Sequence, residues 1–293
     1  MNDLTIIVPA FNEEKAIKDT LVNVLPIIDK FGWNLIVIND GSIDRTKQIL
    51  SEITHPKLSI IEHKVNRGYG ASLKTGIRNS STAYIALYDA DGQHNPEDLE
   101  KMYQHIIEND EDMLVGMRGK DSHQEWVRKP GKFILSKTAN LLTGKKIPDL
   151  NSGLRIIRRD VIVDKLHLFS NAFSFSTTST IALMNMDYKV DYFPIKVNKR
   201  IGTSSVRQFR HGFATILLII RLIMLFNPLK VFLPSSAFFV FIGSIYEIIY
   251  GIILSEHLKL LPGALLAILT GIIIFFMGLV VDQIAEIRKS MKT

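Results

Sequence analysis

The stretch TAYIALYDADGQHNPEDL, residues 82–99, joins three kinds of local sequence. The run YIALY is aromatic and apolar, which is typical of a β-strand. At the other end, Asn95 and Pro96 precede two acids, a pattern that indicates a helix N-terminus with a cap residue and a proline in the first position. Between these elements lie Asp89 and Asp91. The stretch therefore predicts a strand, a polar loop with two carboxylates, and a helix.

The same order of elements recurs through the first half of the chain. Amphipathic stretches of helical length follow three more β-rich runs, namely LTIIV (4–8), NLIVI (34–38) and LSIIE (58–62). This alternation predicts βαβ units and an α/β fold with a mostly parallel sheet. Ligands bind such sheets beyond the carboxyl ends of the strands. Polar clusters follow the first, second and fourth runs: PAFNEE, NDGS and DADGQ. We therefore expect a ligand site at their shared edge.

The carboxylate pair in DADGQ has three interpretations. Turn chemistry explains the helix start but not the pair itself. A calcium loop would use Asp89, Asp91, Gln93 and Glu100 as ligands, but its sixth position is His94 where a glycine is needed, and a strand precedes it instead of a helix. The third is a divalent cation held beside a substrate. The spacing alone leaves turn chemistry and the cation both open.

Two long apolar runs mark the C-terminal part. The chain has 293 residues, of which 47% are hydrophobic, and a mean hydropathy of +0.17. The runs cover residues 231–254 and 260–281, and about 20 apolar residues suffice to cross a bilayer core as a helix. We expect a transmembrane hairpin; the alternative is a pair of buried helices in a soluble core. Glu247 within the first run is expected to face another helix, because a charge facing lipid is unfavourable.

Charge around the hairpin predicts its orientation. Basic residues flank it on both sides: Arg207, Arg210, Arg221 and Lys230 before it, and Arg288, Lys289 and Lys292 after it. By the positive-inside rule, an integral membrane protein of this kind has both termini and its N-terminal part in the cytoplasm. The apolar segment 213–226 is expected to lie in the membrane interface.

Other functional classes are disfavoured by composition. The N-terminus lacks the basic region of a cleavable signal peptide. The chain has no cysteine, which excludes disulfides and thiolate metal sites. The net charge of +6 is better explained by an anionic inner leaflet near the hairpin than by nucleic acid, so no nucleic-acid partner is expected.

Five motifs carry a resemblance to a known family. In order, they are VPAFNEE, INDGSIDRT, NRGYGASLKTG, DADGQHNPEDL and NSGLR. Together they resemble family 2 glycosyltransferases of the GT-A fold, and most of all the polyprenyl- and dolichyl-phosphate sugar synthases. The resemblance implies a Rossmann-like GT-A catalytic domain at 1–210, an interfacial helix at 211–230, two transmembrane helices at 231–281 and a basic cytoplasmic tail at 282–293.

The same resemblance implies a reaction and a donor site. An inverting enzyme of this kind moves one hexose from a UDP- or GDP-linked sugar to a polyprenyl or dolichyl phosphate. A Mg²⁺ or Mn²⁺ ion would be held by Asp89, Asp91 and Gln93, whose oxygen atoms suit hard cations. The resemblance assigns nucleotide binding to Pro9, Phe11, Glu13, Asn39, Asp40, Asp89 and Ala90.

Asn39 departs from the family pattern, which usually has aspartate there. An amide complements the single N–H of uracil flanked by carbonyls, which favours a uridine nucleotide. The alternative is that Asn39 caps a turn and does not contact the base.

The acceptor side lacks a recognisable general base. Residues 173–184, where many relatives that act on sugar hydroxyls carry a carboxylate, contain no acid. A phosphate monoester is already anionic near neutral pH and needs cations instead. The resemblance assigns catalytic or phosphate-binding roles to Asp91, Arg118, Lys132, Ser136 and Arg200; lysine replaces the usual arginine at position 132. Each basic residue is alternatively a solvated surface charge. Asp149 and Ser152 are expected to shape the acceptor loop.

Two other functions stay open. A processive polysaccharide synthase would need a QxxRW element, which residues 208–211 do not supply, and more membrane spans. A non-catalytic membrane scaffold would have no need of the DADGQ cluster. Glu247 in a lone hairpin also makes a homo-oligomer plausible.

Overall fold

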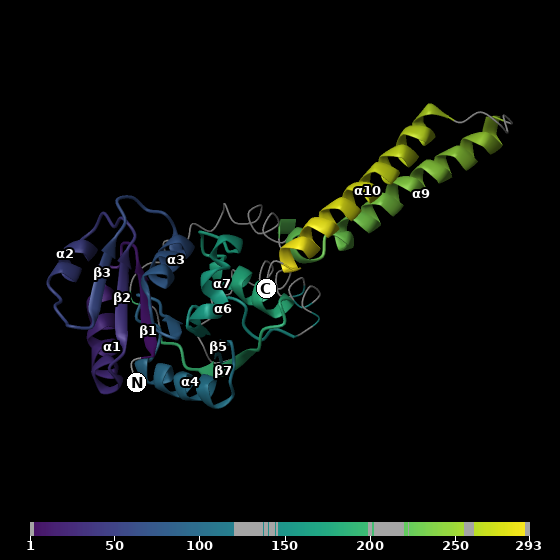
Figure 1. Ribbon diagram of the computed structural model, residues 1–293. Coiled ribbons are helices and arrows are strands. Elements are labelled where there is room, and N and C mark those ends of the chain that lie inside the picture. The colour runs from purple at the N-terminus through teal and green to yellow at the C-terminus, as the bar shows by residue number, and fades with distance from the viewer. Residues whose placement is uncertain are drawn as a thin grey trace. The chain divides into compact units, whose positions relative to one another are not determined.

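The computed structural model forms two compact units, residues 1–211 and 212–293, which we describe separately (Figure 1). The residues that the structure describes are 3–119, 137, 140, 144, 146–198, 201, 220–221, 223–254 and 261–290.

The first unit is built on a seven-stranded sheet in the order β3-β2-β1-β4-β6-β5-β7. The strands are β1 Leu4–Ala10, β2 Asn34–Asn39, β3 Leu58–Glu62, β4 Tyr84–Leu87, β5 Met113–Arg118, β6 Arg155–Arg158 and β7 Val190–Ile195. All neighbouring pairs are parallel except those of β6, which runs antiparallel to both β4 and β5. The expected mostly parallel α/β sheet is thus confirmed, and the four strands expected from sequence are its first four.

Helices cover both faces of this sheet (Figure 1). They are α1 Ile17–Phe31, α2 Thr46–Ser51, α3 Tyr69–Asn79, α4 Pro96–Glu108, α6 Arg159–Val163 and α7 Phe175–Asn185, with a 3₁₀ turn at Leu166–Leu168. Alternate residues of β1 show the layering. Ile6 and Val8 share a buried cluster with residues of α1 and α4, whereas Ile7 lies against Gly76 of α3. Because both faces of β1 are covered, every one of its residues is buried, as is usual for a central parallel strand.

The second unit is a pair of long helices, α9 Leu229–Leu254 and α10 Pro262–Ser290. They pack through glycines: a Cβ added to Gly271 would lie 2.9 Å from the Ser236 carbonyl oxygen, and one added to Gly243 would lie 2.9 Å from that of Ala264. Small residues at such contacts let helix backbones approach closely.

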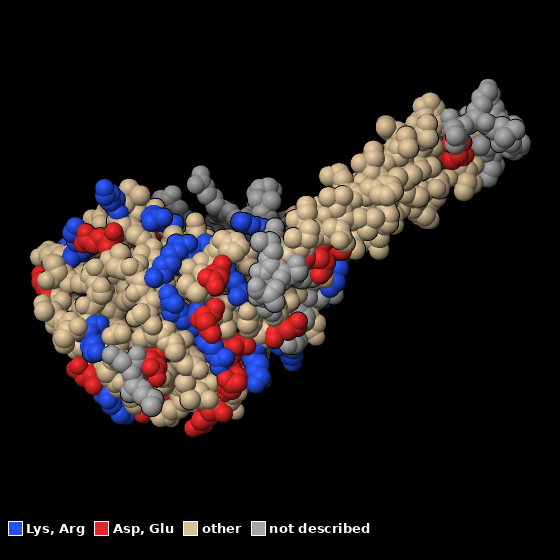
Figure 2. All heavy atoms as spheres, in the orientation of Figure 1, with Lys and Arg blue, Asp and Glu red and all other residues tan. Residues whose placement is uncertain are grey.

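Both helices are long and apolar enough to cross a membrane, over Leu229–Tyr250 and Pro262–Ile287, with hydropathies of 1.7 and 2.8. Most of their large apolar side chains are exposed. Figure 2 shows their surface as almost entirely uncharged, whereas the first unit carries charges of both signs. An apolar exposed surface of this extent is expected of helices that face lipid and not water.

Two expected boundaries need correction. Helix α9 begins at Leu229, inside the segment assigned to the interfacial helix, most of which lies outside the described residues. Helix α10 continues through Ser290 into the segment expected to be a tail. No glycine or proline occurs between 282 and 290, so the helix does not end where its apolar run ends.

Glu247 of α9 faces the other helix, as expected. Its Oε2 accepts a hydrogen bond from the backbone N–H of Leu261, 3.1 Å away, directly before α10 begins. A carboxylate at this position is stabilised by the positive end of the helix dipole.

Candidate active site

The expected site begins where β4 ends. We call residues 88–94 the carboxylate loop. The hydroxyl of Tyr88 donates to the His94 carbonyl oxygen at 2.7 Å. Thr20 of α1 donates its hydroxyl to the carbonyl oxygen of Ala90 at 3.0 Å. The loop is therefore bonded both to itself and to the first helix, which fixes its backbone at the carboxyl edge of the sheet.

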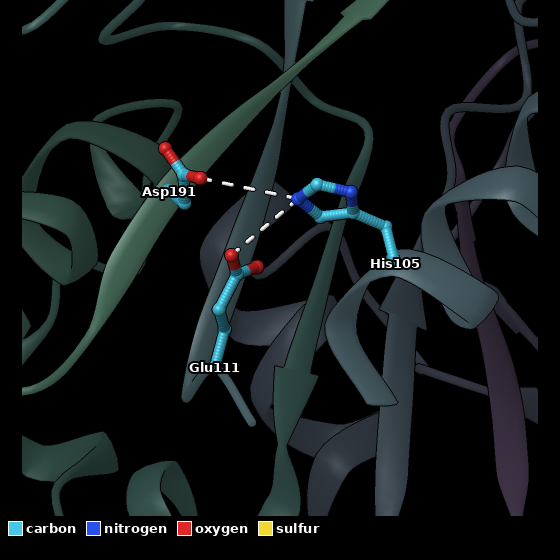
Figure 3. A group of neighbouring side chains, drawn as sticks. All are labelled: His105, Glu111 and Asp191. Atoms are coloured by element: carbon cyan, nitrogen blue, oxygen red, sulfur yellow. Dashed lines mark ion pairs between the residues drawn. The ribbon is translucent and has the colours of Figure 1, made fainter. Parts of the chain in front are cut away.

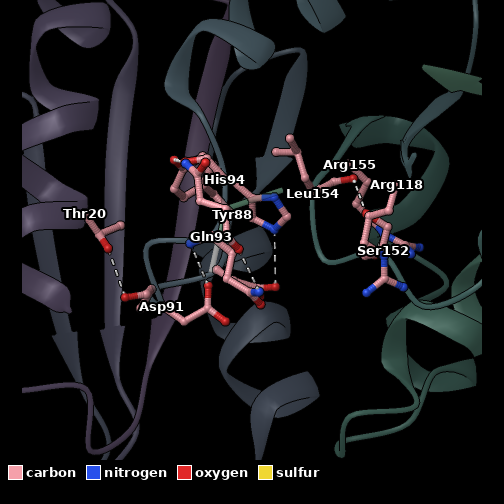
Figure 4. Close-up of polar contacts among 12 residues, drawn as sticks. Thr20, Tyr88, Asp91, Gln93, His94, Arg118, Ser152, Leu154 and Arg155 are labelled. Atoms are coloured by element: carbon pink, nitrogen blue, oxygen red, sulfur yellow. Dashed lines mark hydrogen bonds and ion pairs between the residues drawn. The ribbon is translucent and has the colours of Figure 1, made fainter. Parts of the chain in front are cut away.

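Asp91 and Gln93 are also held by hydrogen bonds within the loop and to the segment that follows β7 (Figure 4). Asp91 is buried, and its Oδ1 accepts the backbone N–H of Gln93 at 3.1 Å. The Gln93 side-chain nitrogen donates to the Asn198 carbonyl oxygen at 3.2 Å, which leaves its amide oxygen as an acceptor. The backbone N–H groups of Asn198 and Ile201 donate to the carbonyl oxygens of Gln93 and Asp91, at 2.8 and 3.1 Å. The segment after β7 thus fixes both residues.

Asp89 has three close neighbours that its sequence position does not indicate. The Tyr69 hydroxyl donates to Oδ1 at 2.9 Å. His94, which the sequence gave no reason to include, places Nε2 3.5 Å from Oδ2. Gly153 lies against the same carboxylate, so that an added Cβ would be only 2.6 Å from the Asp89 Cγ. Burial, and then the charge of Asp89, raise the pKa of Tyr69 well above its ordinary value, so its hydroxyl stays a proton donor.

The side chains of Asp89, Asp91 and Gln93 fit a hard divalent cation by their chemistry. The loop presents two carboxylates and one amide oxygen, a donor set that suits Mg²⁺ or Mn²⁺ together with water and phosphate oxygens. The Gln93 amide is oriented with its nitrogen on Asn198, which leaves the oxygen available as a ligand. The Asp89 carboxylate is oriented by Tyr69.

The two loops expected to bind the nucleotide are joined to each other. Asn12 donates its backbone N–H to the Ser42 hydroxyl at 3.0 Å, and its side-chain Oδ1 accepts the backbone N–H of Ile43 at 2.9 Å. The backbone N–H of Glu13 donates to the Thr46 hydroxyl at 2.9 Å. The PAFNEE and NDGS motifs therefore form one continuous rim.

Three other expected nucleotide residues lie on or beside this rim. Pro9 is buried in β1, beside Ile38 of β2, and Phe11 is half-buried just after the strand. Asn39 is buried, and its Oδ1 accepts the backbone N–H of Ser42 at 3.2 Å. This bond supports the turn-capping alternative for Asn39 over contact with a base.

Asp40 is occupied by another loop. Its Oδ1 lies 2.6 Å from His63 Nδ1 and accepts the Arg67 backbone N–H at 2.9 Å, while Oδ2 accepts that of Gly68 at 2.8 Å. Gly68, with φ of 98°, begins the entry to α3. The carboxylate therefore holds the NRGYG loop in place, and this loop carries Tyr69 to Asp89.

Arg118, expected to bind phosphate, is paired with Asp149. Its Nε and Nη2 donate to the two oxygens of Asp149 at 2.7 and 2.8 Å. The hydrogen bonds to Asp149 raise the pKa of Arg118. Burial acts to raise the pKa of Asp149, but its bonds to Arg118 hold it below the ordinary value. The Arg118 guanidinium is thus held in a fixed position by Asp149, which also neutralises part of its charge. Lys132, Ser136 and Arg200 lie outside the described residues.

Arg155 connects the NSGLR motif to α7. It is fully buried, and its guanidinium donates to the carbonyl oxygens of Ser152 and Ser176 at 2.6 and 2.9 Å. It also reaches the hydroxyls of Ser179 and Thr180. This arrangement makes Arg155 an internal support for the turn that holds Gly153 against Asp89.

The chain matches two protein-family models. Residues 5–164, more than half of the chain, match the family model described as glycosyl transferase family 2. The chain belongs to glycosyltransferase family 2. As a family 2 glycosyltransferase it is an enzyme that transfers sugar, as the resemblance predicted. Residues 227–287 match a second model, the GtrB C-terminal hairpin, and these residues include nearly all of α9 and α10.

Several relatives of this family 2 glycosyltransferase act on lipid phosphates by name. The UDP-N-acetylglucosamine–dolichyl-phosphate N-acetylglucosaminyltransferase of Methanococcus voltae is 33% identical, covering 54% of this chain and 70% of that one. A dodecaprenyl-phosphate galacturonate synthase of Rhizobium johnstonii is 28% identical over 55% of this chain and 49% of its own. An uncharacterized protein of Methanocaldococcus jannaschii is 33% identical over 67% of this chain and 81% of its own.

Solved structures show the same fold. Glucosyl-3-phosphoglycerate synthase of Mycobacterium tuberculosis, crystallised with Mg²⁺ and UDP, superposes with a TM-score of 0.59 at 14% identity, over 76% of this chain and 78% of its own. The same enzyme with Mn²⁺ and UDP-glucose gives 0.58 at 15% identity, over 76% and 79%. The GT-A-like α/β fold is confirmed, and the presence of Mg²⁺ or Mn²⁺ in these neighbours is consistent with a divalent metal here.

Proposed function

We propose that the protein transfers one hexose from a nucleotide-diphosphate sugar to a polyprenyl or dolichyl phosphate at the membrane. The observation that carries the proposal is the oriented oxygen-donor set of the carboxylate loop, in a family 2 glycosyltransferase whose chain continues into an apolar helical hairpin. The lipid-phosphate acceptors named for its relatives support the same acceptor class.

On the donor side, Asp89, Asp91 and Gln93 would hold a Mg²⁺ or Mn²⁺ ion. The ion, when bound, neutralises the negative charge that develops on the leaving group. The rim formed by the PAFNEE and NDGS motifs holds the nucleoside, with Asp40 acting through the NRGYG loop. The capped Asn39 gives no preference between UDP and GDP, so the nucleotide base is decided by the assay below.

On the acceptor side, no protein base is needed. Helix α7, Phe175–Asn185, contains no carboxylate. Because a phosphate monoester with a second pKa of about 6 is already ionised, its oxygen attacks the anomeric carbon directly. The new carbon–oxygen bond forms as the bond to the diphosphate breaks, with inversion. We assign binding of the acceptor phosphate to Arg118, Lys132, Ser136 and Arg200.

The hairpin would anchor the enzyme in the membrane that contains its acceptor. By the positive-inside rule, the basic residues before α9 and at the end of α10 support an orientation with both termini and the catalytic unit in the cytoplasm. Protease protection in sealed inverted vesicles tests this orientation, because a catalytic unit in the lumen would be protected.

The experiment is a transfer assay with the full chain in detergent, a short polyprenyl phosphate and Mn²⁺, with UDP- and GDP-sugars in separate reactions. We expect one donor to yield a lipid-phosphate sugar, and Asp91→Asn to abolish the product. Asp19→Asn is the matched control, since Asp19 is an exposed acid of α1 beside the loop's anchor Thr20. Donor hydrolysis without any lipid product would refute the acceptor assignment, and loss of activity in the control would invalidate the comparison.

A further inference from the structure

Three side chains converge at the sheet edge away from the carboxylate loop (Figure 3). His105 lies in the last turn of α4, Glu111 comes just before β5, and Asp191 is the second residue of β7. Both strands point their carboxyl ends toward the active-site edge, where Arg118 ends β5. The cluster at their beginnings is therefore separated from the donor site by the length of the strands.

The ligand-type atoms of this cluster are close together. His105 Nε2 lies 3.4 Å from Glu111 Oε1 and 3.9 Å from Asp191 Oδ2. One atom from each residue falls within 4.8 Å of the others. The ring of His105 is held by an edge contact with Phe193, at 5.4 Å between centroids. Three elements distant in sequence thus aim one imidazole and two carboxylates at one point.

Two buried atoms of the cluster have no hydrogen-bond partner among the described residues. They are Nε2 of His105 and Oε2 of Glu111. Glu111 is only 6% exposed, so its unpartnered oxygen faces the protein interior and not water. A buried carboxylate oxygen without a partner is unfavourable, and each such atom calls for an explanation.

We propose that His105, Glu111 and Asp191 form a second metal site, for Zn²⁺ or a similar transition-metal ion. Imidazole and carboxylate ligands suit such ions, which are bound at about 2.0–2.2 Å with three protein ligands and one water. Tetrahedral ligands at that distance lie about 3.4 Å apart, which is the observed separation of His105 and Glu111.

Asp191 is the ligand with the most freedom to complete this geometry. Its side chain is 59% exposed, so rotation can shorten its 3.9 Å separation from His105 Nε2. The bound ion would be a common partner for His105 Nε2 and for the Glu111 carboxylate, whose Oε1 lies nearest to the ring and whose Oε2 has no hydrogen bond. It would also tie the end of α4 to the edge strand β7.

This link between α4 and β7 extends to the active site through β7. The chain that leaves β7 bonds to the carboxylate loop through the backbone N–H groups of Asn198 and Ile201. A metal at the beginning of β7 therefore stabilises the strand whose end positions Asp91 and Gln93. The site is structural in this proposal and takes no part in sugar transfer.

The test is Zn²⁺ binding to the full chain in detergent, after EDTA treatment and without nucleotide. Asp91→Asn serves as the background, so that metal binding at the carboxylate loop is weakened. We expect one Zn²⁺ per chain by calorimetry and a higher thermal midpoint with Zn²⁺. Adding Asp191→Asn to this background is expected to weaken Zn²⁺ binding by about 10- to 100-fold or more. Because Asp191 is largely exposed, this variant should fold.

Glu108→Gln is the matched control. It removes one negative charge from the same helix end, where Glu108 is exposed, and it is expected to leave Zn²⁺ affinity within about twofold. His105→Asn provides a second ligand variant. Absence of Zn²⁺ binding in the background protein, or equal affinity in the ligand variants and the control, would overturn the proposal and leave the cluster as an ion-pair network.

Discussion

Replacement of Gly153 by alanine tests whether the Asp89 carboxylate must sit where the structure places it. The added Cβ would be 2.6 Å from the Asp89 Cγ and nearer still to one oxygen. Moving the Cγ to an ordinary contact of about 3.4 Å requires a shift of about 0.8 Å. Such a shift would also strain the 2.9 Å hydrogen bond from Tyr69.

The expected result is a loss of activity without a loss of fold. Misplacement of a reacting or orienting group by about 1 Å costs on the order of 100-fold. We therefore expect kcat/KM to fall about 30- to 100-fold, equivalent to about 2 to 2.7 kcal/mol of transition-state stabilisation. The Mn²⁺ concentration for half-maximal rate should rise, because Asp89 is a proposed ligand.

The assay is sugar transfer across a Mn²⁺ titration, with thermal unfolding as a check on stability. Gly119→Ala is the control, since a Cβ there meets nothing within 4 Å among the described residues. A folded Gly153→Ala protein with kcat/KM and Mn²⁺ dependence within about threefold of wild type would refute the assignment of Asp89.

Three further predictions address the supports of the site. Tyr69→Phe removes the hydroxyl that orients Asp89 and should lower kcat/KM about tenfold, with a raised Mn²⁺ requirement in the same titration, because a hydrogen bond to a charged group contributes about 1.5–3 kcal/mol. Arg155→Met leaves buried carbonyl oxygens without donors and should lower the free energy of unfolding by about 3 kcal/mol, measured by urea denaturation; an unchanged midpoint would contradict its supporting role. The lowered pKa of Asp149 means that its bonds to Arg118 stabilise the fold above the unfolded pKa and that this contribution is lost as pH falls through the folded value. Asp149→Asn should therefore flatten the decline in stability below about pH 4, and an identical acid profile in both proteins would show that the pair contributes nothing.

The first four strands could be predicted because each is a short, nearly continuous apolar run next to a polar cluster. Strands β5 and β7 were harder to predict from the sequence. Gly116 interrupts β5, and Pro194 lies within the edge strand β7, where no further strand needs its missing N–H. The single antiparallel strand β6, Arg155–Arg158, begins and ends with arginine and shows little of a buried strand.

At the site, the sequence indicated the residues but not all of their tasks. Asp40 was a sound candidate for a ligand contact, yet its partners are His63 and the backbone N–H groups of Arg67 and Gly68, and the two backbone donors leave no mark in residue type. The internal role of Arg155 was not predicted, because arginines are rarely fully buried. The one available signal was the hydroxyl-rich FSTTST of α7, which supplies neutral partners for a buried cation.

The hydrogen bond between Glu247 and Leu261 has a consequence for insertion into a bilayer. A lone carboxylate in a membrane helix costs about 2.5–3.5 kcal/mol at its centre, and an uncapped helix start leaves N–H groups without water to bind. Here the two unfavourable groups satisfy each other across the hairpin. In a bilayer, the first helix would therefore gain its full stability only when the second had entered beside it, which would make the hairpin, and not either helix, the unit of insertion.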